Sequence, residues 1–367
     1  MKYMKHIYKV RAKLLIMMSA VLLLTACSND TDRLSDEEGV LQIAAYTKDM
    51  ATPSWPAATR AISIPSDYSQ YTGSASIGVF LTPTTTEMTL IYYEDSVWHS
   101  MAKVSTGTQY YIYGYMPAYA TCQISQNVNF ENGAVLTFNN IPSVMSEDFS
   151  VITGIMQLES DSTGIPIEEG TLKSGTFSYT GKGNGRNFVT LMFDHLYGAL
   201  SISLKVDLDY NSLRTIKLKE LKLRNRVEDT PAKSHTNVTV TLTKTEGTNP
   251  ISNIVFTPTG DDVGDISFFQ SATGEELVTN YKTFTGHFMP EGITTFVLTS
   301  VYDVYDKKGN LIRKDCTANN TLEISKLFDR QDMTKRGWKY NVNMTIMPTF
   351  LYMLSEPDLN NPTVAVN

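Results

Sequence analysis

The five histidines are the side chains best suited to acid–base or metal chemistry in this chain. None lies in an HExxH pattern or pairs with another at a spacing typical of metal ligands. One histidine ends the apolar run Phe193-Asp194-His195-Leu196, where Asp194 would have to orient His195 for catalysis. Neighbouring residues of a strand point to opposite faces, so we interpret His195 as a structural residue at a strand end. The histidines are His6, His99, His195, His235 and His287.

Carboxylates occur in close pairs, and glycosidases use two carboxyl groups across a cleft. Acidic turns are the usual explanation of such pairs, which are Asp207 with Asp209, Glu168 with Glu169, and Asp261 with Asp262.

The glycines of residues 181–185 resemble a phosphate loop but lack its Lys-Ser/Thr ending and a following helix. No GxSxG elbow and no calcium-binding loop occur. The sequence therefore favours a protein that is not an enzyme and holds no metal or cofactor.

Charge and cysteine content narrow the class of protein further. The chain of 367 residues has 31 basic and 38 acidic residues, a net charge of −7. A nucleic-acid partner requires a basic surface, which this composition does not supply. Hydrophobic residues make up 42% of the chain, enough for a core. We interpret Cys122 and Cys316 as separate buried thiols, although an oxidising envelope would allow them to pair.

The first 27 residues form a targeting signal. Lysines and an arginine precede the apolar run of residues 14–26, which is too short to span a bilayer and suits a signal peptide. The run ends in Leu24-Thr25-Ala26-Cys27, which resembles the bacterial lipobox. We therefore predict a lipid on Cys27, with two or three acyl chains as the membrane anchor. Residues 28–38 are polar and acidic and form a tether.

From Ile62 onward the dominant hydrophobic period is two, which predicts strands. Ile216 and Leu218 are out of phase with Leu221 and Leu223, which indicates a β-bulge near Glu220. Many short strands between turn residues predict an all-β chain built of sandwiches. Clear strands are expected at 77–81, 110–115, 201–208, 237–244, 293–302 and 341–347, and one short helix at 322–328. About half of the residues at 110–115 should be buried.

In the order and spacing of several motifs, the chain resembles the Bacteroidetes fimbrillin family, whose members are the subunits of lipoprotein-derived pili. Each motif alone is a strand with a turn, but together they cover nearly the whole chain. The motifs are the lipobox at Cys27, Ala58-Thr59-Arg60-Ala61, Ile77-Gly78-Val79-Phe80, Tyr111-Ile112-Tyr113-Gly114-Tyr115-Met116-Pro117, Leu191-Met192-Phe193-Asp194-His195-Leu196 and Gly337-Trp338-Lys339-Tyr340-Asn341-Val342.

The resemblance implies two tandem transthyretin-like β-sandwich domains after a lipoprotein signal peptide. The three glycines in residues 181–185 provide a hinge between the domains. The expected units are a signal peptide with lipobox at 1–27, a tether with a removable first strand at 28–60, an N-terminal sandwich at 61–185 and a C-terminal sandwich at 186–367.

The resemblance also implies assembly by strand exchange at the cell surface. A protease would cut between Arg60 and Ala61 and release a strand within residues 40–46, with Leu41, Ile43 and Ala45 on one face. A neighbouring subunit would then fill the groove with a strand from its residues 348–367. Either of two apolar stretches could insert, although the first could instead be the final strand of the second domain. The donor candidates are Phe350, Leu351, Tyr352, Met353, Leu354, Val364 and Val366.

The expected function is that of an adhesive fimbrial subunit exported as an outer-membrane lipoprotein. Its partners would be other fimbrial subunits and a receptor on a host or bacterial surface. A glycan is one candidate for this receptor. Stalk, tip and anchor subunits share this fold, so the sequence leaves open which of the three this chain is. The alternative is an uncut outer-membrane lipoprotein that acts as a fimbrial anchor or as a monomeric glycan-binding module with an exposed aromatic patch.

Overall fold

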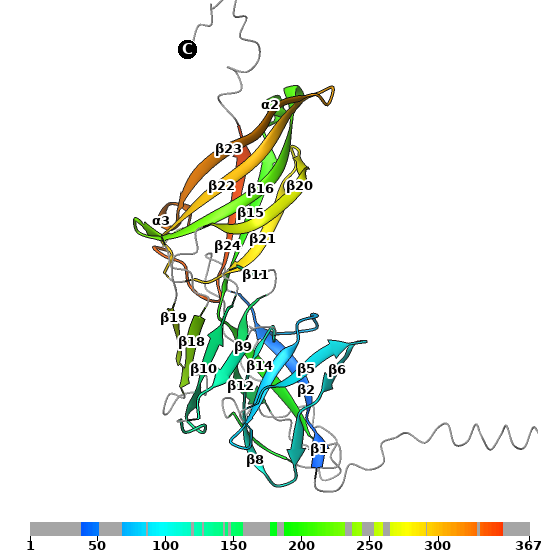
Figure 1. The fold of residues 1–367 in the computed structure, drawn as a ribbon, viewed down its shortest axis with the longest axis vertical. Coiled ribbons are helices and arrows are strands. Elements are labelled where there is room, and N and C mark those ends of the chain that lie inside the picture. Colours follow the sequence, from blue (N-terminus) through cyan, green and yellow to red (C-terminus); the bar gives the residue numbers. More distant parts are fainter. Residues whose placement is uncertain are drawn as a thin grey trace, which may run out of the picture.

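The computed structural model describes the chain between residues 38 and 347, with gaps. The described residues are 38–50, 68–85, 87–118, 121–126, 128–141, 144–145, 148–156, 177–181, 187–231, 237–243, 253–259, 265–290, 292–328 and 331–347. Strands dominate, and the two helices within these ranges are short (Figure 1). The predicted all-β class is confirmed. No helix among these residues is long and apolar enough to cross a membrane.

The largest sheet within the described residues has nine strands and carries the N-terminal part of the chain (Figure 1). Its order is β3 (Tyr68–Gln70), β2 (Gln42–Lys48), β14 (Phe188–His195), β12 (Ser150–Met156), β8 (Gln109–Met116), β4 (Ile77–Thr82), β5 (Thr89–Glu94) and β6 (Val97–Ser100), with β13 (Ser178–Thr180) also paired to β8. A separate two-stranded ladder joins β1 (Glu38–Val40) to β7 (Lys103–Ser105). The predicted strand at 77–81 is confirmed as β4.

A four-stranded sheet completes this part of the molecule. Its order is β19 (Asn253–Thr259), β18 (Asn237–Thr243), β10 (Gly133–Asn139) and β9 (Thr121–Ile124). β18 confirms the predicted alternation, because Val238, Val240 and Leu242 are all buried. Buried side chains of these sheets form one group, the first cluster, which includes Leu41, Ile77, Tyr115, Leu191 and Val240.

Two further sheets enclose a second group of buried side chains. One sheet has the order β11 (Val144–Met145), β21 (Lys282–Phe288), β15 (Gly198–Val206) and β24 (Lys339–Ile346). The other has the order β17 (Thr230–Pro231), β16 (Arg214–Val227), β22 (Thr295–Asp306) and β23 (Leu311–Glu323), with β20 (Ile266–Leu277) also paired to β16. Their second cluster includes Ile202, Leu218, Leu221, Phe288 and Tyr340.

The predicted bulge on β16 is confirmed. The register against β22 shifts between Leu218 and Glu220, which restores the burial of Leu221 after Leu218. The extra residue, Lys219, turns its ammonium group toward two carboxylates, those of Asp303 and Asp315. The bulge therefore keeps one strand apolar on its inner face and places a cation on its outer face.

Three expectations from the sequence need correction. Within 110–115 every residue except Tyr111 is buried, because aromatic rings cover one face of β8 and Tyr110 and Ile112 are buried on the other. The strand expected at 201–208 ends at Val206, and Leu208 is exposed in helix α2 (Leu208–Leu213). The helix expected at 322–328 is shortened to α3 (Ile324–Leu327), because β23 extends to Glu323.

The predicted domain division near residue 185 stays a prediction. The two clusters do not divide the chain at a single point. Leu191 and Phe193 follow residue 185 but belong to the first cluster, and so do Val238 and Val240. Cys122 packs against the first cluster and Cys316 lies within the second, and both thiols are free. The predicted separation is confirmed, but only Cys316 is buried, and Cys122 is partly exposed.

Candidate functional site: the place of the first strand

The first described strand segment, residues 38–48, lies within the sheets with one face buried. Leu41 and Ala45 are 0% exposed and Ile43 is 6% exposed, whereas Gln42 between them is exposed. All three buried residues belong to the first cluster. The alternation that the sequence predicts for residues 40–46 is therefore present, and this strand contributes to the core.

The same segment is paired along both of its edges. On one edge β2 runs parallel to β14, from Gln42 opposite Phe188 to Thr47 opposite Phe193. On the other edge β1 pairs antiparallel with β7, and the end of β2 pairs antiparallel with β3. Within the described residues β7 pairs with no strand other than β1, so residues 38–48 join β7 to the nine-stranded sheet.

Main-chain hydrogen bonds continue this pairing between the ladders. The Leu41 N–H donates to the Ala102 carbonyl at 2.8 Å, just before β7, and the Tyr71 N–H donates to the Ala45 carbonyl at 2.8 Å, just after β3. We call the place occupied by residues 38–48 the first-strand seat. If these residues withdrew, the edges of β14 and β7 would lose their partners and the first cluster would be opened beneath them. An unpaired strand edge beside exposed apolar side chains of the core is a template for another strand.

A buried polar group lies where β2 ends. The His195 ring, on the last residue of β14, contacts the Asp148 carboxylate through Nδ1 and the Lys48 carbonyl through Nε2. The Ser150 hydroxyl donates to the same oxygen of Asp148 at 2.6 Å. Burial acts to lower the pKa of His195, but the hydrogen bond and charge of Asp148, together with Asp194 and Lys48, raise that pKa above its ordinary value of 6.5.

Asp194 extends this group toward the second cluster. Its carboxylate lies 3.9 Å from the Lys48 ammonium and 3.2 Å from the guanidinium of Arg336. Arg336, which stands shortly before β24, also donates to the His195 carbonyl at 2.9 Å. We call His195, Asp148, Lys48, Asp194 and Arg336 the strand-end cluster. It connects the end of the first strand to the segment that leads into β24.

The interpretation of His195 as a structural residue at a strand end is confirmed. Asp194 does not orient its ring, since its carboxylate instead accepts the His195 backbone N–H at 2.8 Å. The ring partner is Asp148, which sequence reasoning missed. Asp148 precedes β12 and reaches His195 because β12 pairs with β14 with Ser150 opposite His195. The pairing of the two strands would have been needed to find it.

The other predicted site residues lie outside the described residues. They are the lipidation site Cys27, the processing site Arg60 and Ala61, and the donor candidates Phe350, Leu351, Tyr352, Met353, Leu354, Val364 and Val366. Of the paired carboxylates, Glu168 with Glu169 and Asp261 with Asp262 also lie outside them. Asp207 caps helix α2 by accepting the backbone N–H groups of Asp209 and Tyr210 at 3.0 and 3.2 Å. In the described part of the chain, no three metal-ligating side chains gather.

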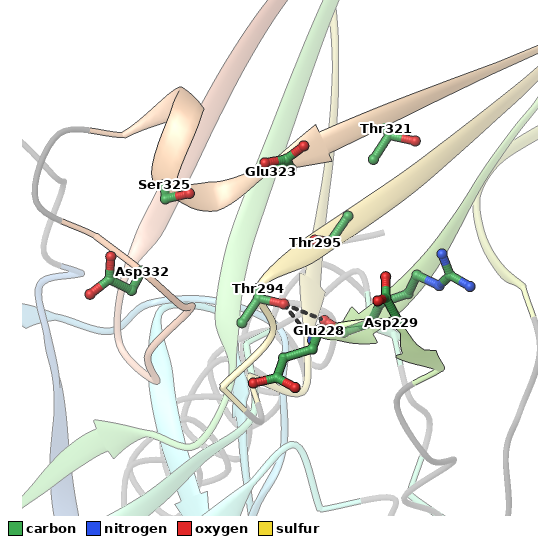
Figure 2. A pocket seen from close by; sticks show the side chains of 9 residues that line it. Glu228, Asp229, Thr294, Thr295, Thr321, Glu323, Ser325 and Asp332 are labelled. Carbon is green, nitrogen blue, oxygen red and sulfur yellow. Dashed lines mark hydrogen bonds between the residues drawn. The ribbon is translucent and has the colours of Figure 1, made fainter.

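An open polar pocket of about 410 Å³ lies at one end of the sheet that contains β16 and β22. Figure 2 shows Glu228 and Asp229 at the turn after β16, facing Thr294 at the start of β22. The Glu228 backbone N–H donates to the Thr294 hydroxyl at 2.7 Å. The lining is Arg226, Glu228, Asp229, Thr294, Thr295, Thr321, Glu323, Ser325 and Asp332. It offers hydroxyl and carboxylate groups and the guanidinium group of Arg226, but no aromatic ring.

The hairpin of β5 and β6 carries partly exposed aromatic side chains. Tyr92 and His99 stack across the two strands with ring centroids 5.2 Å apart and planes inclined by 17°. Val97 is 56% exposed on the same hairpin. On the opposite face Tyr93 contacts Trp98, which packs against the first cluster. Stacked rings at a surface provide flat contact area for a partner.

Comparison with known proteins gives matches among solved structures. No family model matches the chain, and no curated protein matches it. The matches include solved structures of Bacteroides proteins described as fimbrial or as putative cell adhesion proteins. Two of them, from Bacteroides uniformis and Bacteroides fragilis, are described as a “putative cell adhesion protein” and are 14% and 12% identical, with TM-scores of 0.40 and 0.41. Each comparison covers 84% of this chain and 94% of the other.

A third match is a fimbrial protein from Bacteroides vulgatus. It is 14% identical with a TM-score of 0.34, and the comparison covers 75% of this chain and 89% of that one. At these identities and scores, function does not transfer from these proteins to this chain.

Proposed function

We propose that this chain is a cell-surface fimbrial subunit that assembles by exchange of its first strand and serves adhesion. The observation that carries the proposal is the first-strand seat. A strand near the chain start is paired on both edges and buries Leu41, Ile43 and Ala45, so its loss creates a groove shaped for another strand. In this proposal the chain has no catalytic role, and its two transthyretin-like sandwiches enclose the first and the second cluster.

The connection between β2 and β3 supports the proposed cleavage. β2 ends at Lys48 and β3 begins at Tyr68, so Arg60 lies in the segment that joins them. A cut between Arg60 and Ala61 would leave residues 27–60, with the lipid on Cys27, held to the rest of the chain by non-covalent contacts alone. The strand could then leave without unfolding the second cluster.

The incoming strand would come from residues 348–367 of a second subunit. Alternating apolar side chains of that segment, such as Tyr352 and Leu354, would replace those of the first strand, and main-chain hydrogen bonds would join the two subunits. One such contact repeated head to tail gives a filament.

The N-terminus and mass of the mature protein at the cell surface test the proposal. We expect a chain that begins at Ala61 and runs as heat-labile ladders of high mass. Arg60→Ala should leave the lipidated precursor intact and block assembly, whereas Arg313→Ala, on the exposed face of edge strand β23, should change neither. Normal filaments from the Arg60→Ala chain would refute the cleavage site.

Truncation after Pro348 tests the donor. The shortened chain should fold and accept a donor strand, but it should give none, so it ends a growing filament when mixed with the full chain. Polymerisation of the truncated chain alone would place the donor elsewhere.

A second candidate function, an uncut outer-membrane lipoprotein that binds glycan, is favoured by the β5–β6 hairpin. Its stacked Tyr92 and His99 offer a platform of the kind that sugar rings contact. In this case Tyr92→Ala should weaken binding to a glycan array at least tenfold. Tyr281→Ala, which removes a tyrosine that is 49% exposed elsewhere, should not.

A further inference from the structure

The ring of His195 faces two hydrogen-bond acceptors at once. A backbone carbonyl cannot donate a proton, so Nε2 must carry one to bond with the carbonyl of Lys48. On the other side, Nδ1 faces the carboxylate of Asp148, which already accepts the Ser150 hydroxyl. The protonation state that gives both ring nitrogens an acceptor is an imidazolium between a carboxylate and a carbonyl.

The surrounding charges favour this imidazolium. Asp148 contacts the ring from the segment before β12, and Asp194 lies beside it on β14. The cations nearby, Lys48 of β2 and Arg336 of the segment before β24, direct their charge to Asp194 at 3.9 and 3.2 Å. Of the two described residues that hydrogen-bond the ring nitrogens, Asp148 does so through a charged group, and that group is negative.

The contact is placed at the end of the strand that the proposed function requires to leave. Lys48 is the last residue of β2, and its carbonyl is held by His195 while its ammonium group lies near Asp194. If the first strand detaches from its Lys48 end, it must break these two contacts first. The connection that would be cut at Arg60 follows directly from this end in the sequence.

We propose that His195 is a pH-dependent latch on the first strand. The latch holds the Lys48 end of β2 while both ring nitrogens are protonated. It frees this end when Nε2 loses its proton to solvent and Nδ1 keeps the proton that it donates to the Asp148 carboxylate, the stronger acceptor. The latch concerns the same strand as the proposed function and takes its biological meaning from it. When Nε2 takes up a proton again, its N–H group would bond a carbonyl of the incoming strand in the place of the Lys48 carbonyl.

The direction of the pH effect follows from the native-state pKa of His195, which lies above the ordinary value of 6.5. The stabilisation is fully present below the ordinary value and is lost as the pH rises through the raised value of the folded protein. Alkaline conditions should therefore loosen the strand end, and conditions below the ordinary pKa of the ring should hold it.

Hydrogen exchange in the uncleaved chain tests the latch. The protection factor of the backbone amides of residues 45–48, corrected for the intrinsic exchange rate at each pH, should fall about tenfold or more as the His195 ring titrates. A ¹⁵N titration of the ring nitrogens should give the same midpoint, above 6.5. Amides in β22, a strand that packs around the second cluster, should show no such change in protection with pH.

Two variants separate a latch from simple packing. His195→Gln should abolish the pH step, whereas His99→Gln, at the exposed face of β6, should leave it unchanged. Asp148→Asn removes the negative partner but keeps its shape, so the midpoint should move to lower pH. If His195→Gln fails to fold, the Asp148→Asn midpoint and the ring titration still decide.

The latch is overturned if the protection of residues 45–48 has the same pH dependence with and without His195. It is also overturned if His195 titrates at or below the ordinary value, or if Asp148→Asn leaves the midpoint unmoved. Each result is obtained without cleavage or assembly. A failed latch therefore leaves strand exchange standing, and a failed Arg60→Ala experiment leaves the latch standing.

Discussion

Leu41→Ala should destabilise the first cluster strongly while leaving the second cluster intact. Leu41 is 0% exposed, and its neighbours along the strand are held on both sides by β14 and β7, so the cavity cannot close by movement of the backbone. Buried leucines replaced by alanine in such sites cost about 3 to 5 kcal/mol. With a urea dependence of about 2 kcal/mol per molar, the midpoint of unfolding should fall by about 1.5 M or more.

Tryptophan fluorescence can report the two clusters separately. Trp98 packs against the first cluster and Trp338 against the second. The third tryptophan, Trp55, lies outside the described residues, so chains in which only Trp98 or only Trp338 is kept give one signal each. Leu41→Ala should lower the midpoint seen by Trp98 and leave that seen by Trp338. Gln42→Ala, on the exposed face of the same strand, should change neither by more than about 0.5 kcal/mol. An unchanged Trp98 midpoint in Leu41→Ala would refute the packing of the first strand.

Three further predictions concern the scaffold. Asp207→Ala should cost about 1 kcal/mol in urea unfolding followed at Trp338, because the cap of α2 is lost, while Asp209→Ala should cost less. Gly133→Ala should destabilise far more than Gly107→Ala, since a Cβ at Gly133 would lie 1.9 Å from the Leu242 carbonyl and one at Gly107 meets nothing within 4 Å. Because burial raises the pKa of the Cys122 and Cys316 thiols, both should resist alkylation by iodoacetamide at pH 8 until urea unfolds the chain, as measured by peptide mass spectrometry.

The positions of strands were predictable where one face of the strand is buried and the other is exposed to solvent. The alternation of Leu41, Ile43 and Ala45 and that of Val238, Val240 and Leu242 both appear in the structure as the sequence indicates. The bulge on β16 was predictable for the same reason, since a break in phase between Leu218 and Leu221 has few other solutions.

Partners and strand ends were not predictable from local pattern. The parallel pairing of β2 with β14 and the contact between Asp148 and His195 depend on which strands become neighbours. Leu208 continues an apolar alternation, but the side chain of Asp207 caps a helix there and ends the strand. Burial on both faces of β8 likewise depends on sheets that form elsewhere in the chain.

The parallel ladder between β2 and β14 also bears on the order of folding. Gln42 is synthesised early and pairs with Phe188, which emerges much later, so this contact has a high sequence separation. Contacts of this kind form late, because the intervening chain must first be closed into a loop. The hairpins β4–β5 and β5–β6 are local and can form without the first strand. We therefore expect the first strand to be among the last parts to dock, onto a body that has already folded around its place.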